Sequence, residues 1–170
     1  GTASVKLEAS GEREELYYVY AKGKLYDVCT AINTAVKTAD ENLGVVVDGN
    51  LQNIWERGNK VTKLTLDTST FPDVIRNGSM DVAAIEEGTG RKALDLSGCT
   101  LDSVLYYVSE GTPVLAKTPI TDQTPQGIVI IAGYDEYNTI LMNPGETETF
   151  YYGINDSTAL FEEAGNVFMT

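Results

Sequence analysis

The strongest constraint on the fold is an uninterrupted apolar run at residues 127–133, which reads Gly-Ile-Val-Ile-Ile-Ala-Gly. A strand with one face in water alternates between apolar and polar residues, whereas a strand covered on both faces is apolar throughout. The run is also far shorter than the roughly 18 apolar residues that a membrane-spanning helix requires. It therefore predicts a central strand, and the rest of the chain has to supply elements that cover both of its faces.

The elements around this strand are predicted from alternation, helical spacing and turn residues. Strands are expected at 61–66, 113–116, 139–142, 150–152 and 166–169, with short helices near Val74 and at 82–85. Thr100 is a good N-cap for a helix at 101–108, and Asp156 or Ser157 is expected to cap a last helix that Gly165 ends. Residues 61–170 thus indicate an α+β domain in which an antiparallel sheet packs with helices.

A smaller unit is predicted at residues 16–60, before this domain. It combines a strand at 16–20, a helical face formed by Val28, Ile32, Ala35, Ala39 and Leu43, and a hairpin around Asp48-Gly49. Asp27 is the candidate N-cap of the helix, and Gly44 is its candidate C-terminal glycine. We interpret the unit as a small β-α-β-β module, with the entrance to the main fold as the alternative.

Residues 1–15 are small or charged and are expected to form a flexible tail. The opening Gly1-Thr2-Ala3-Ser4 is typical of a cloning remnant, so we interpret the chain as a piece of a longer protein.

The charge balance excludes two classes of partner. The chain has 25 acidic and 12 basic residues and a net charge of −13. Such a surface repels phosphate backbones and anionic lipid headgroups, so we expect neither nucleic-acid binding nor peripheral membrane binding. Because no run reaches roughly 18 apolar residues, we also expect no membrane insertion of this fragment.

The absence of histidine from the 170 residues constrains the chemistry most. It excludes Ser-His and Cys-His catalytic pairs and histidine-ligated metal sites. The two cysteines, Cys29 and Cys99, are too few for a four-thiolate zinc site, and their spacing leaves a disulfide open. The stretch 88–92 lacks the spacing of a phosphate-binding loop, and no calcium-loop pattern occurs. We expect no metal and no cofactor.

Four short motifs between residues 93 and 168 carry a resemblance to a known family. They are the segment Leu94–Cys99 with its following helix, Gly111-Thr112-Pro113-Val114, the run at 127–131, and Gly133-Tyr134-Asp135 followed by Asn143-Pro144. In this order and spacing they resemble the papain-like cysteine peptidase superfamily, in particular the bacteriocin-processing (double-glycine) peptidases and their extracellular relatives. The resemblance implies a papain-like fold for residues 61–170.

The same resemblance implies that the peptidase machinery is missing. Ile128 stands where the family has its catalytic histidine, and Asn143 stands where an acid or amide orients that ring. The nucleophile would lie upstream of residue 93, but residues 61–92 contain no cysteine. Because a thiol needs a nearby base or a strongly lowered pKa to attack an amide, we expect a non-catalytic domain.

The function implied is binding, scaffolding or display within a larger bacterial secreted or cell-surface protein. The ligand would be a peptide, a protein or a cell-wall fragment. A retained groove would be lined by Gly127, Ile128, Tyr134 and Asn143, and Trp55 is a further candidate because flat rings stack on such ligands.

Two alternatives remain open. The first is a thiol peptidase or acyl transferase that uses Cys99, which lies just before a helix N-terminus, with a base other than histidine. Cys29 is expected to pack as an apolar side chain beside Val28 and Ile32. The second alternative is a spacer without a ligand.

Overall fold

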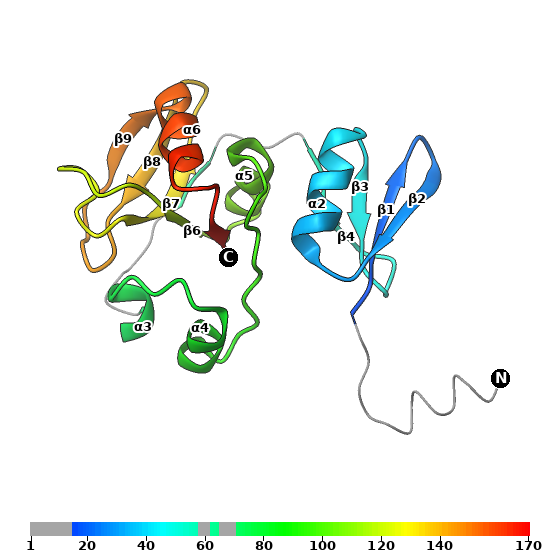
Figure 1. Cartoon of the computed structure of the whole chain (residues 1–170), viewed down its shortest axis with the longest axis horizontal. Helices are drawn as coiled ribbons and strands as arrows, with labels where there is room; N and C mark the ends of the chain where they lie inside the picture. Colours follow the sequence, from blue (N-terminus) through cyan, green and yellow to red (C-terminus); the bar gives the residue numbers. More distant parts are fainter. Residues whose placement is uncertain (1–14, 58–61, 65–70) are drawn as a thin grey trace.

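A computed structural model describes residues 15–57, 62–64 and 71–170, which form two antiparallel sheets with helices (Figure 1). The first sheet has the order β2-β1-β3-β4 and is built from β1 (Tyr17–Ala21), β2 (Lys24–Cys29), β3 (Val45–Val47) and β4 (Asn53–Trp55). Its helix is α2 (Ile32–Glu41). The α+β class that the sequence predicts is confirmed, and the papain-like assignment stays a prediction.

The second sheet has six strands, with β10-β6-β7-β8-β9 in order and β5 paired with β7. The strands are β5 (Thr62–Lys63), β6 (Val114–Lys117), β7 (Ile128–Tyr134), β8 (Asn138–Met142), β9 (Phe150–Gly153) and β10 (Phe168–Met169). The helices are α3 (Asp73–Arg76), α4 (Val82–Thr89), α5 (Leu101–Ser109) and α6 (Ile154–Glu163). In Figure 1, α3 and α4 lie below this sheet, while the first sheet lies to the right of α5.

The predicted central strand is confirmed, because β7 pairs with β6, β8 and the short β5. Direct cross-strand pairs sort its side chains onto two faces. Ile131 pairs with Val114 and Leu141, and all three belong to the larger buried cluster. Ile130 pairs with Leu115 on β6, and both belong to a second, smaller buried cluster.

The smaller cluster is a row of side chains that crosses four strands of the second sheet. Met169 pairs with Leu115, Leu115 with Ile130, and Ile130 with Met142. Ile85 of α4 joins this row, and side chains of α3 pack against it. The larger cluster includes buried residues of α5 and α6 on the opposite face, so both faces of β7 are covered by helices.

The larger cluster continues into the first sheet. Trp55 of β4 is fully buried, and its Nε1 donates a hydrogen bond of 2.8 Å to the main-chain oxygen of Ser103 in α5. Asn33 of α2 donates through Nδ2 to the oxygen of Ser97 at 3.0 Å. The unit at 16–60 therefore shares a core with the rest of the chain, while its independence as a module stays a prediction.

The start of α2 differs from the sequence prediction. The strand β2 continues to Cys29, and the helix begins at Ile32 with Ala31 as its N-cap, not at Val28 with Asp27. Val28 and Cys29 pair with β1, and the carboxylate of Asp27 accepts from the Val28 N–H. The predicted β-α-β-β unit therefore has a complete additional strand, because hairpin pairing with β1 outweighs the helical spacing of these residues.

Two glycine and capping assignments also differ in detail. Leu43, with φ 55°, holds the left-handed position after α2, whereas a Cβ on Gly44 would lie 2.4 Å from the oxygen of Tyr20. Gly44 is required by this close approach to β1. The last helix, α6, begins at Ile154 with Gly153 as N-cap, ahead of the expected Asp156 or Ser157.

Several predictions are confirmed or lie outside the described residues. The hydroxyl of Thr100 accepts a hydrogen bond from the Ser103 N–H and caps α5, as expected. The Asp48-Gly49 turn joins the antiparallel strands β3 and β4. The expected tail at 1–15, except Glu15, and the expected boundary at 58–60 lie outside the part of the chain that the structure describes.

Candidate functional site

Three of the residues expected to line a groove lie at one end of the second sheet. Gly127 precedes β7, Ile128 begins it, and Asn143 follows β8. These strands are antiparallel, so the start of one lies beside the end of the other. Tyr134 ends β7 at the opposite end of the sheet, and Trp55 is fully buried in the first sheet. The structure thus brings together Gly127, Ile128 and Asn143 but neither of the two aromatic residues.

Ile128 is covered by the chain itself. A Cβ placed on Gly78, which lies between α3 and α4, would come within 3.7 Å of the Cδ1 of Ile128 and 3.2 Å of the Oε1 of Gln126. Gln126 in turn donates through Nε2 to the oxygen of Pro144 at 3.0 Å. The position that matches the family's histidine therefore holds an isoleucine packed beneath the α3–α4 connection.

Asn143 is 5% exposed and is held by one hydrogen bond. Its Nδ2 donates to the oxygen of Gln123 at 2.9 Å, while its Oδ1 accepts no hydrogen bond from the described residues. The amide therefore fixes the loop that leads into β7, and it lies beside Ile128 rather than beside a titratable ring.

Both cysteines are free and buried. Cys99 is fully buried, its Sγ–H donates to the oxygen of Asn33 at 3.6 Å, and burial raises the pKa of its thiol to about 12. Burial also raises the pKa of Cys29, and the negative charge of Asp27 adds to the shift. The helix N-terminus that follows Cys99 does not compensate for this burial, so both thiols stay protonated near neutral pH.

A cavity of about 470 Å³ lies on the same sheet face as Ile128, toward β6 and β10. Its floor is formed by the side chains of Leu115, Ile130, Met169 and Ala93, which belong to the smaller buried cluster. Because strand residues two apart share a face, Ile128 and Ile130 point to the same side of the sheet. Ile128 is half-buried next to the connection between α3 and α4, whereas Ile130 lines the cavity.

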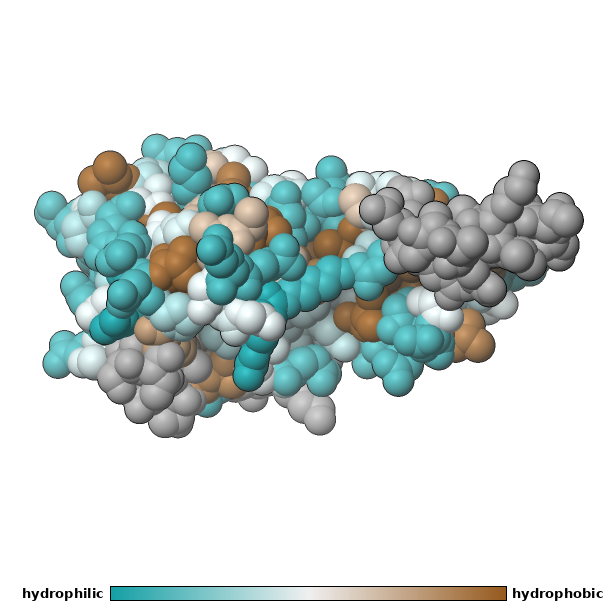
Figure 2. Space-filling model, turned by 90° about the horizontal axis from the view of Figure 1, so that it is seen from below, coloured by the Kyte–Doolittle hydropathy of each residue, from teal (hydrophilic) through white to brown (hydrophobic). Residues whose placement is uncertain are grey.

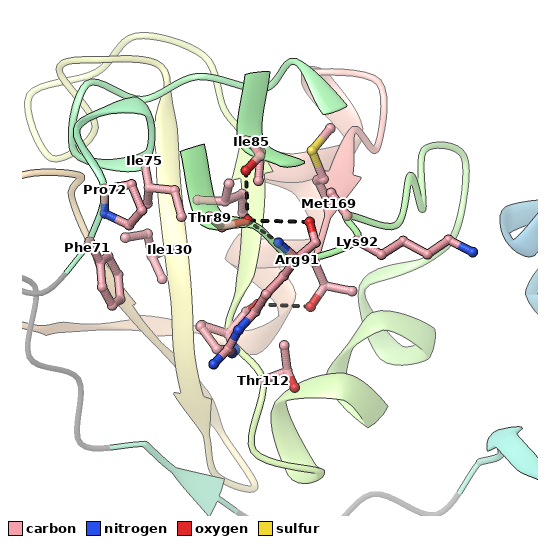
Figure 3. A pocket seen from close by; sticks show the side chains of 14 residues that line it. Phe71, Pro72, Ile75, Ile85, Thr89, Arg91, Lys92, Thr112, Ile130 and Met169 are labelled. Atoms are coloured by element: carbon pink, nitrogen blue, oxygen red, sulfur yellow. Dashed lines mark hydrogen bonds between the residues drawn. The ribbon is translucent and has the colours of Figure 1, made fainter. Parts of the chain in front are cut away.

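The walls of the cavity come from the two short helices and the segments around them. On the helical side they are formed by Phe71, Pro72, Ile75, Ile85 and Thr89, and on the opposite side by Arg91, Lys92, Thr112, Pro113 and Thr170. Figure 2 views the molecule from the α3–α4 side and shows hydrophobic residues exposed among hydrophilic ones. Figure 3 shows the isoleucines and Phe71 around the cavity. The volume and apolar lining are typical of a small-molecule or side-chain pocket.

The wall near Arg91 is organised by the hydroxyl of Thr89, at the end of α4. It donates to the oxygen of Ile85 at 2.7 Å and accepts from the N–H of Arg91 at 3.1 Å (Figure 3). Gly90 holds the left-handed conformation that ends the helix, with φ 67°. This turn directs the main chain from α4 across the mouth of the cavity.

The sequence analysis did not find this cavity. Its lining comes from five separate stretches of the chain, so no local pattern marks it. One available signal was the pair Arg91-Lys92, two adjacent basic residues in a chain of net charge −13. The stretch 88–92 lacks the spacing of a phosphate-binding loop, and the charge pair alone does not indicate a cavity.

Two further findings concern the described residues only. No three of their cysteine and acidic side chains gather closely enough to hold a metal ion. None of their helices has the length and apolar character needed to cross a bilayer.

Comparison with known proteins gives one similar solved structure. No family model matches the chain, and no curated protein is significantly similar to it. A crystal structure of a candidate C39-like peptidase from Bacillus anthracis is 17% identical, with a TM-score of 0.43. The similarity covers 52% of this chain and 55% of that one, so it concerns about half of each protein.

Proposed function

We propose that this chain is a non-catalytic papain-like domain of a larger bacterial secreted or cell-surface protein, and that it binds a ligand in the cavity beside α3 and α4. The observation that carries the proposal is the open, apolar cavity of about 470 Å³ on the face of the sheet that also carries Ile128. The papain-like assignment comes from the motifs at 93–168, in which Ile128 replaces the histidine.

The side chains of the chain support binding without catalysis. There is no histidine to act as a base, and both thiols are buried. With a pKa of about 12, the thiolate form of Cys99 is about one part in a hundred thousand at pH 7. A nucleophile this rarely ionised, and without access to solvent, cannot attack an amide bond at a useful rate.

The alternative function is a thiol enzyme that acts through Cys99, and the position of this residue before α5 is what favours it. Its neighbours oppose it, because the nearest hydrogen-bond partner of the thiol is the main-chain oxygen of Asn33, which is not a base. Lys37 lowers the pKa of the thiol, but the effect of burial is larger.

Thiol labelling separates the two functions. The native chain is treated with a fluorescent iodoacetamide at pH 7, and the same reaction is repeated in denaturant. We expect both cysteines to react only after denaturation, since neither is accessible in the folded chain. Rapid labelling of the native chain that Cys99→Ser abolishes and Cys29→Ser retains would establish the enzyme instead.

The binding site is tested by blocking the cavity. Thr112 is exposed at the cavity wall, so Thr112→Trp fills the mouth without disturbing the core. Thr34→Trp, on the exposed side of α2, is the matched control. We expect peptides or cell-wall fragments that bind the native chain to bind the control equally and the blocked variant at least tenfold more weakly. Binding that survives the block would refute the cavity as the binding site, and no binding at all in such a screen would leave a spacer.

A further inference from the structure

We propose that the cavity binds an apolar group that ends in a carboxylate, with the guanidinium of Arg91 holding the carboxylate. This inference rests on the proposed binding function and names the class of its ligand. It is carried by three observations: an apolar interior, an arginine at its wall that has no ion pair with a described residue, and two of three wall hydroxyls that donate to the main chain.

The interior selects an apolar group. Ile130 and Met169 are almost fully buried in the sheet, and Ile85 of α4 faces them across the cavity. No acidic residue lines this space among the described residues. Burial of apolar surface is the main source of affinity in such a site, with a gain of about fourfold for each buried methylene group.

Arg91 supplies the charge. Of the three arginines that the structure describes, Arg57 is paired with Asp40 and Arg76 with Asp73, while Arg91 has no ion pair with a described residue. Figure 3 shows its side chain lying along the cavity toward Thr112. A guanidinium presents two parallel N–H donors that match the two oxygens of a carboxylate.

Lys92 does not compete for the same anion. Its side chain points away from the cavity in Figure 3 and makes an ion pair with Glu15, which precedes β1. The adjacent basic residues therefore have different tasks. Lys92 ties the cavity wall to the N-terminal unit, and Arg91 remains available to a ligand.

The hydroxyls of the wall disfavour a carbohydrate. Thr89 is bonded to the oxygen of Ile85, and the hydroxyl of Thr170 donates to the oxygen of Pro113 at 3.0 Å. A sugar needs many free donors, whereas two of the three wall hydroxyls already donate to the main chain and only Thr112, at the mouth, is left. The cavity therefore fits a ligand with one anionic end and an otherwise apolar body.

The experiment is calorimetric titration of the whole chain with decanoate, octanoate and the neutral analogue decanamide. Decanoate is expected to bind, octanoate about fifteenfold more weakly because two methylene groups are lost, and decanamide at least tenfold more weakly because the charge is lost. Arg91→Gln is expected to weaken decanoate about tenfold and to leave decanamide unchanged. Arg91→Lys, which keeps the charge but not the paired donors, should give an intermediate value.

Lys117→Gln is the matched control, since Lys117 is an exposed cation of β6 that does not line the cavity. It should bind decanoate as the native chain does. A blocked tripeptide that ends in leucine with a free carboxylate distinguishes the two sources of this chemistry. Tighter binding of the peptide than of decanoate would identify peptide C-termini as the natural ligands, and weaker binding would identify free carboxylic acids.

The inference is overturned if decanamide binds as well as decanoate, if Arg91→Gln leaves the affinity for decanoate unchanged, or if neither carboxylate binds. The blocked variant then separates its failure from that of the proposed function. Where another ligand binds and Thr112→Trp abolishes its binding, the cavity is a site for a different class and the proposed function stands. Where Thr112→Trp changes no binding, the proposed function fails as well.

Discussion

The two faces of the second sheet are made by the same strands and differ in how completely they are packed. On one face, Ile131 and its neighbours meet α5 and α6 in the larger cluster, which extends to the buried Trp55 of the first sheet. On the other face, Ile130 and its row meet the short helices α3 and α4, and a cavity of about 470 Å³ remains. Of two adjacent residues of β7, Ile131 therefore packs in a closed core and Ile130 lines the cavity.

This difference follows from the length of the covering helices. The helices α5 and α6 have nine and ten residues, and each is long enough for its buried side chains to pack along the strands. Helix α3 has four residues, and none of them is buried. A short pair of helices shields part of a sheet face and leaves the remainder accessible. Most of the packing that stabilises the sheet is therefore on the α5–α6 face, and a ligand is expected on the α3–α4 face.

The largest expected effect comes from truncating the two adjacent isoleucines of β7. Ile131→Ala should lower the free energy of unfolding by about 4 kcal/mol, because it opens a void in a closed core. Ile130→Ala should cost about 2 kcal/mol, because its side chain already borders empty space. Urea denaturation followed by circular dichroism measures both. Equal losses would mean that the two faces are equally well packed.

The next effect concerns the contact between the closed core and the first sheet. Trp55→Phe removes the hydrogen bond to the oxygen of Ser103 and leaves that buried oxygen without its donor. We expect a loss of about 2 kcal/mol in the free energy of unfolding. The denaturation curve also tests the module predicted at 16–60. One shared transition that moves as a whole indicates a single cooperative unit, whereas a separate early transition indicates an independent module.

The third effect is the dependence of stability on alkaline pH, which belongs to the closed core because Cys99 lies in it. Burial raises the pKa of this thiol from its ordinary value of 9.0 to about 12. Below pH 9 the thiol is protonated in both states, and the stability is fully present. Between pH 9 and pH 12 only the unfolded chain ionises, so stability falls, by about 1 kcal/mol at pH 10.

Cys99→Ala tests this slope. The substitution lowers stability at neutral pH because it shortens a buried side chain, but its stability should fall less steeply between pH 9 and pH 11 than that of the native chain. Burial also raises the pKa of Tyr107, and the negative charge of an ionised Cys99 raises it further, so removing the thiol reduces both contributions in the same direction. Identical slopes would show that the thiol ionises in the folded chain and is not closed off.

The closed face could be predicted from sequence to a greater extent than the open one. The run at 127–133 shows by its composition that both sides of the strand are covered, and Thr100 marks the start of α5 by a local hydrogen bond. The start of α2 was predicted too early, because the helical spacing includes Val28 while hairpin pairing with β1 continues β2 to Cys29.

The candidate site was predictable only in part, for a similar reason. Ile128 and Asn143 could be placed together because they flank neighbouring antiparallel strands. The cavity could not be anticipated, since its walls depend on how far α3 and α4 extend over the sheet. That distance is set by tertiary packing, and the role of Arg91 is visible only once the acidic partners of the other arginines are known.

The smallest expected effect is a gain on the open face. Ala93 lines the cavity, so Ala93→Val adds two methyl groups to empty space and should raise the free energy of unfolding by up to about 1 kcal/mol. The matched substitution is Ala116→Val, because Ala116 is fully buried on the closed face between Phe168 and Val129. There the same groups have no room and should cost 1 to 3 kcal/mol, as overpacking does. If thermal denaturation shows that Ala93→Val raises the stability and Ala116→Val lowers it, the two faces differ in free volume. A loss of stability for Ala93→Val would mean that the cavity closes in solution.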